Sequence, residues 1–64
     1  MTTVALADQI ACVRRELAMR QRVYPRWVYA GKMTQADSDR EITTMIAVLA
    51  TLQEVQRQRE PGLL

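Results

Sequence analysis

Glycine and proline, the residues that most often interrupt helices, occur at only four positions in this sequence. They are Pro25 and Gly31 near the middle, and Pro61 and Gly62 near the end. One long uninterrupted stretch precedes Pro25, and a second lies between Gly31 and Pro61. Apolar residues in both stretches recur every three or four positions, as they do on one face of a helix and not in a strand. The sequence therefore predicts an all-α fold.

The first stretch predicts a helix over about residues 3–24. Because Pro25 has no amide hydrogen and its ring clashes with the preceding turn, we expect this helix to end at Tyr24. Its apolar residues are spaced by four, three, four and seven positions, so they form one stripe that should face a partner helix. The stripe consists of Leu6, Ile10, Val13, Leu17 and Tyr24.

A short helical elbow is expected over about residues 25–33. Pro25 suits the first position of a helical turn, and Gly31 suits the left-handed residue that closes one. A connection this short makes the two long helices antiparallel neighbours. The second long helix is expected over about residues 34–59, with a short tail at 60–64. Thr34 and Asp37 resemble a capping box at its start, with Asp in place of the commoner Glu.

The expected hairpin is too small to form a large core by itself. The chain has 64 residues and forms one domain, and a core of this size contributes only about 3–5 kcal/mol. Cys12 is the only cysteine and there is no histidine, so neither an intrachain disulfide nor a zinc site is expected. Apolar residues of the second helix cover an arc of about 180°, wider than the roughly 100° that one neighbour needs.

These features predict that two hairpins associate as a helix-bundle homo-oligomer, with a dimer favoured. The first helix supplies a second, weaker apolar stripe to the expected interface, and the second helix supplies its surplus arc. The expected interface residues are Cys12, Met19, Met45, Val48, Leu49, Leu52 and Val55.

No set of residues predicts catalysis. Asp37, Asp39 and Glu41 are acidic, but the helix dipole favours negative charge in the first turns of a helix, which explains all three. No histidine is present to activate Cys12, so a small buried hydrophobe is the better interpretation of that residue. We therefore expect no enzyme activity, no metal and no cofactor.

A basic and aromatic segment lies at residues 14–32. It holds six basic residues, one acidic residue and all three aromatic residues of the chain. One interpretation is a surface for single-stranded nucleic acid, which needs positive charge and stacking platforms. The other is a structural plug, in which aromatics close the end of the bundle and arginine stems pack along its wall. The residues expected to bind nucleic acid or another partner are Arg14, Arg20, Arg22, Arg26, Trp27, Tyr29 and Lys32.

The sequence predicts a cytoplasmic protein without a membrane segment. The N-terminal residues lack the basic stretch and apolar core of a signal peptide. The longest mostly apolar run, residues 42–52, is shorter than the roughly 18 residues that span a bilayer.

The string RQRVYPRWVYAGKMTQADSDREITTMIAVLATL at residues 20–52 resembles a group of small uncharacterised proteins of tailed phages and prophages. That group shares a VYP-x-x-V-x-x-G-K/R-M/L elbow between a basic helix and a helix with an acidic start. The matching positions are Arg20, Val23, Tyr24, Pro25, Val28, Gly31, Lys32, Met33, Asp39, Ile42 and Met45.

The resemblance carries no established activity. It implies an accessory protein of a phage in the cytoplasm of a bacterium, and similar small proteins often sit among recombination and early genes. The leading hypothesis is therefore a non-enzymatic accessory protein that self-associates and contacts a phage or host protein. The alternative is a nucleic-acid-binding accessory protein of phage DNA metabolism.

Overall fold

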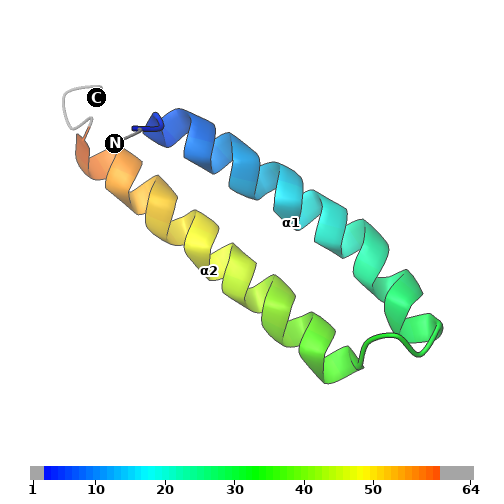
Figure 1. Cartoon of the computed structure of the whole chain (residues 1–64). Coiled ribbons are helices and arrows are strands. Elements are labelled where there is room, and N and C mark those ends of the chain that lie inside the picture. Colours follow the sequence, from blue (N-terminus) through cyan, green and yellow to red (C-terminus); the bar gives the residue numbers. More distant parts are fainter. Residues whose placement is uncertain (1–2, 60–64) are drawn as a thin grey trace.

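The computed structural model is a hairpin of two long helices that pack against each other (Figure 1). It describes residues 3–59. Helix α1 spans Leu6–Tyr29 and helix α2 spans Gln35–Arg59. The start of α1 therefore lies beside the end of α2, and the connection at residues 30–34 closes the other end. The predicted all-α fold and its two packed helices are confirmed, whereas the predicted tail at residues 60–64 lies outside the described residues.

The first helix does not end where the sequence predicted. It begins at Leu6 instead of residue 3, and it continues through Pro25 to Tyr29. The separate helical elbow expected at about residues 25–33 is therefore wrong, because residues 25–29 form the last turns of α1 and only residues 30–34 connect the helices. The proline removes the hydrogen bond that the carbonyl of Gln21 would otherwise accept. Both Pro25 and Gln21 are exposed, so water can hydrate that carbonyl group.

Packing on both sides of Pro25 favours the continuous helix. Tyr24 is buried, with 8% of its surface exposed. Its ring stacks on that of Trp27, with centroids 5.6 Å apart and planes inclined by 28°. This contact joins residues three apart, which face each other only when the helix continues past the proline. Tertiary packing thus outweighs the local preference of proline to end a helix.

Gly31 ends α1 as the sequence predicted. Its φ of 75° is the only positive value among the described residues. The amide of Gly31 donates to the carbonyl of Val28 at 3.1 Å, and the amide of Lys32 donates to that of Trp27 at 2.9 Å. This pair of hydrogen bonds is the Schellman motif, which satisfies the last carbonyl groups of a helix. The reversal of the chain therefore begins at Gly31.

Thr34 begins α2, also as predicted. Its hydroxyl oxygen accepts a hydrogen bond from the amide of Asp37 at 3.0 Å, and its carbonyl accepts one from the amide of Ser38 at 3.0 Å. These are the bonds of an N-cap threonine. The reciprocal half of a capping box differs from the prediction, because the Asp37 carboxylate binds the guanidinium of Arg40.

The line of contact between α1 and α2, which we call the seam, buries few side chains. Ile10 and Tyr24 are the only buried apolar residues among those described, and Ser38 is the only buried polar one. The predicted stripe does face α2, since Leu6, Val13 and Leu17 are half-buried on the same face of α1 as the two buried residues. No described side chain is fully enclosed, because each helix has only one neighbour.

We expect Gly31→Val to lower the free energy of unfolding by roughly 1–2 kcal/mol or more, since a β-branched residue disfavours positive φ. A Cβ atom at this position would meet no atom within 4 Å, so backbone strain alone would cause the loss. Gly31→Asn is the matched control, because asparagine tolerates this conformation better, and it should cost less. Thermal unfolding measures both variants. Equal stability of Gly31→Val and the wild type would contradict this role of Gly31.

Candidate functional site

Arg20 connects the two helices at the seam. Its Nε lies 3.0 Å from Oε1 of Glu16 on the same helix, and its Nη1 lies 3.6 Å from Oε2 of Glu41 on α2. The same Nη1 donates to the backbone carbonyl of Glu41 at 3.3 Å. The guanidinium carbon also lies 5.8 Å from the centroid of the Tyr24 ring, within the range of a cation–π contact.

These contacts correct one of the sequence assignments. Arg20 was expected on a surface that binds nucleic acid or another partner. Instead only 19% of its side chain is exposed, and its guanidinium binds two carboxylates within the hairpin. The planar fork of arginine suits such multiple contacts. Arg20 is therefore a structural residue that holds α2 against α1.

The acidic residues at the start of α2 do not converge on one point. Asp37 binds Arg40, Asp39 accepts a hydrogen bond from the amide group of Gln35 at 2.9 Å, and Glu41 binds Arg20. The hydrogen bond from Arg40, followed by one from Thr34, lowers the pKa of Asp37 below its ordinary value. Within residues 3–59, no three acidic or cysteine side chains are grouped as a metal site requires. Each carboxylate has a local partner on or beside its helix.

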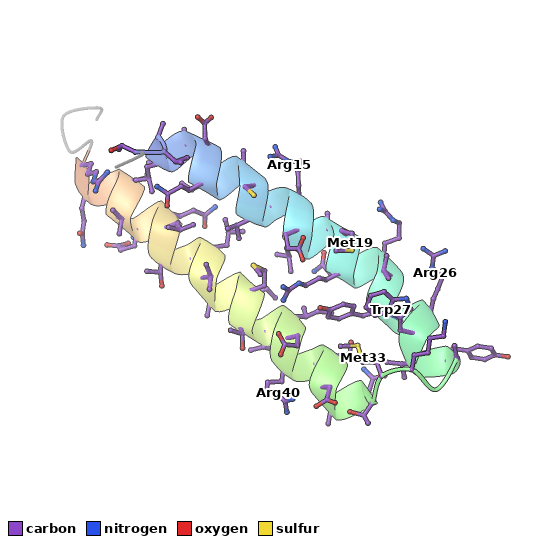
Figure 2. All side chains as sticks on the ribbon, in the orientation of Figure 1. Arg15, Met19, Arg26, Trp27, Met33 and Arg40 are labelled. Atoms are coloured by element: carbon purple, nitrogen blue, oxygen red, sulfur yellow. The ribbon has the colours of Figure 1, made fainter. Side chains whose placement is uncertain are left out.

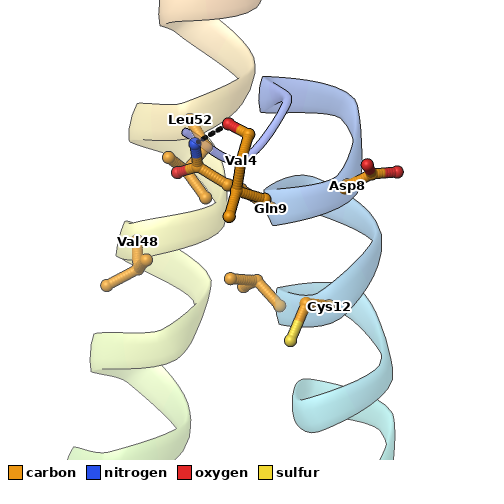
Figure 3. A pocket seen from close by; sticks show the side chains of 7 residues that line it. Val4, Asp8, Gln9, Cys12, Val48 and Leu52 are labelled. Carbon is orange, nitrogen blue, oxygen red and sulfur yellow. Dashed lines mark hydrogen bonds between the residues drawn. The ribbon is translucent and has the colours of Figure 1, made fainter. Parts of the chain in front are cut away.

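An apolar groove lies between the first half of α1 and the second half of α2 (Figure 3). Its volume is about 640 Å³ and it is open to solvent. The amide group of Gln9 donates to the carbonyl of Val4 at 2.9 Å across one end of it. We call this the open-end groove. Its lining residues are Val4, Asp8, Gln9, Cys12, Val13, Val48 and Leu52.

The groove brings together three residues that the sequence assigned to an oligomer interface. Cys12, Val48 and Leu52 line it, and Cys12 and Val48 are exposed. The sequence missed Val4, which is 52% exposed, because it placed this residue inside the first helix and on neither apolar stripe, whereas α1 begins only at Leu6. It also missed Val13, which had been assigned only to the seam.

The remaining expected interface residues divide between the groove face and the seam. Met19 follows Cys12 by seven residues and Val55 follows Val48 by seven, so both lie on the face of the groove. Leu49 follows the buried Ser38 by eleven residues, about three helical turns, and so faces α1. Met19, Met45, Leu49 and Val55 are all half-buried. The helical position of Leu49 directs it toward the seam, and its assignment to an oligomer interface stays a prediction.

The aromatic residues of the basic segment have different environments. Tyr24 is buried and Trp27 stacks on it with 43% of its surface exposed, whereas Tyr29 is 95% exposed. The structural-plug interpretation therefore fits Tyr24, and fits Trp27 in part. It does not fit Tyr29, the last residue of α1, whose side chain extends into solvent.

Three arginines form a row on the side of α1 that faces away from α2. They are Arg15, Arg22 and Arg26, which we call the outer arginine row, and all three are exposed. Their spacings of seven and four place them on one helical face, and Tyr29 follows Arg26 by three on that face. Figure 2 shows Arg15 and Arg26 on the far side of α1 from α2. Arg14 and Lys32 are also exposed, outside this row, whereas Arg15 was not among the predicted surface residues.

Comparisons with known proteins found no family model, no curated protein and no solved structure that matches this chain. Neither α1 nor α2 combines the length and the apolar character that crossing a membrane requires.

We expect Arg20→Gln to lower the free energy of unfolding by about 1.5–3 kcal/mol, as the loss of hydrogen bonds to charged groups does. Arg22→Gln is the matched control, because it removes the same charge from an exposed position and should change stability by less than about 0.5 kcal/mol. Denaturant unfolding of both variants tests this expectation. If the two variants unfold alike, Arg20 does not hold the helices together.

Proposed function

We propose that this chain is a small non-enzymatic module that self-associates and acts through protein–protein contact. Its resemblance to small proteins of tailed phages and prophages supports a role as an accessory protein in the bacterial cytoplasm that contacts a phage or host protein. The occupant we propose for the open-end groove is a second copy of the chain, and the assembly is a helix-bundle homodimer.

The observation that carries this proposal is the amount of surface that the hairpin leaves exposed. A compact monomer of 7.4 kDa exposes about 4,200 Å², whereas this chain exposes 5120 Å². Its radius of gyration is 15.0 Å, compared with about 11 Å for a compact domain of this length. The hairpin is therefore more extended than a compact domain of its length, and it leaves apolar surface that a partner can cover.

The position of the exposed apolar side chains supports a second copy as the occupant. Cys12 and Val48 are exposed on opposite walls of the groove, and Met19 and Val55 extend the same face. A twofold axis places the same patch of both chains in contact, so the apolar face around the groove of one chain can cover that of the other. Two stacked hairpins would then give each helix a second neighbour, as in a four-helix bundle.

We expect Val48→Asp to convert the dimer into a monomer, because association would bury an unpaired carboxylate. Val48 is 41% exposed in the single hairpin, so the hairpin itself should tolerate the change. Ala47→Asp is the matched control: Ala47 is the neighbouring residue, it is exposed, and it lies about 180° around α2 from Ser38, on the side away from α1.

Sedimentation velocity of the wild type and both variants gives the result, and circular dichroism checks that the variants remain helical. The proposal requires a dimer for the wild type and Ala47→Asp and a monomer for Val48→Asp. A monomeric wild type, or a Val48→Asp variant that remains dimeric, would refute it.

A further inference from the structure

We propose that the outer face of α1 binds single-stranded nucleic acid. In this proposal the outer arginine row contacts successive phosphates and the Tyr29 ring stacks on a base. The site adjoins the open-end groove, since Asp8 lines the groove and also lies on the face of the row, and it is formed by α1 of a single chain.

The outer arginine row carries positive charge that the hairpin does not neutralise. Three arginines outside the row form ion pairs with acidic residues. Arg20 binds Glu16 and Glu41, Arg40 binds Asp37, and Arg57 binds Glu54. No ion pair among residues 3–59 involves Arg15, Arg22 or Arg26. The only acid on their face of α1 is Asp8, seven residues before Arg15. The row therefore places three positive charges along one side of α1, against the single negative charge of Asp8.

The geometry of the row suits a linear polyanion. Arg22 lies two residues before the buried Tyr24, about 200° around the helix, so the row is directed away from the seam. From Arg15 to Arg26 the row extends about 16 Å along the helix axis. Phosphates recur about every 3.4 Å along each strand of a duplex, and the row is long enough to contact several of them. Arginine forks bind phosphate oxygens in pairs, which lysine does not do.

Tyr29 favours a single strand over a duplex or an acidic protein. Its ring is 95% exposed at the end of the row, one helical turn beyond Arg26, and makes no stacking contact among the described residues. A solvent-exposed ring beside phosphate-binding residues is what an unstacked base requires. The bases of a duplex are already stacked on one another, and acidic side chains have no aromatic ring to stack on that of Tyr29.

The test is fluorescence anisotropy of the full chain with a labelled single-stranded DNA oligonucleotide and with its RNA counterpart, beginning at roughly 50 mM salt. The row variant is Arg15→Gln with Arg22→Gln and Arg26→Gln. Its matched control is Arg40→Gln with Arg57→Gln and Arg59→Gln, which removes the same charge from exposed residues of α2. We expect the row variant to bind more weakly and to lower the salt dependence, the slope of log affinity against log salt, by about 2. The control should retain most of the wild-type affinity.

Tyr29 provides a second, independent variant. Tyr29→Ala should weaken binding by roughly 5- to 150-fold, the loss typical of one stacked base, while Tyr29→Phe keeps the ring and the affinity. Since the side chain is exposed, neither change should affect folding.

Four results would overturn the proposal. The first two are no binding of either strand at low salt and an equal loss of affinity in the two triple variants. The third is equal affinity of Tyr29→Ala and Tyr29→Phe for the single strand. The fourth is stronger binding to a duplex or to polyglutamate than to the single strand. A preference between the DNA and RNA strands would identify the source of the ligand, and either preference supports the proposal.

Discussion

Two helices share only one seam, and this constraint governs the rest of the structure. Each helix has one neighbour, so side chains that point sideways remain partly exposed whatever their chemistry. Ile10 and Tyr24 are buried, while Val48 and Cys12 on the adjoining face are exposed. The open-end groove and the large exposed area both follow from this arrangement. A second hairpin on the same face would add the neighbours that the single chain lacks.

The seam is stabilised at its closed end by polar and aromatic contacts more than by an apolar core. Arg20 links α1 to α2 through Glu41 while packing on Tyr24, and Tyr24 in turn stacks on Trp27. Gly31 and Thr34 complete this end, because one terminates α1 and the other begins α2. Among residues 3–59, the opposite end shows no such set of contacts and contains the groove. The hairpin is thus fixed at one end and presents apolar surface at the other.

The sequence predicted the features that depend on local backbone chemistry. A glycine that allows positive φ and a threonine that caps a helix act within a few residues, and Gly31 and Thr34 behave as expected. Pro25 does not, because the packing of Tyr24 and Trp27 outweighs a local preference. Arg20 resembles Arg22 and Arg26 in the sequence, and its different role depends on Glu41, which is 21 residues away. Which arginine faces a distant carboxylate, and which tyrosine remains exposed, can be decided only after the two helices have been placed.

We propose that the folded hairpin is half of an assembly, and the most direct test is the thermal unfolding of the wild-type chain over a wide range of protein concentration. Association that accompanies folding stabilises the native state by mass action, so the unfolding midpoint then depends on concentration. The account predicts a midpoint that rises steadily as the chain is concentrated. A midpoint that stays constant across the range, with monomeric mass throughout, would contradict it.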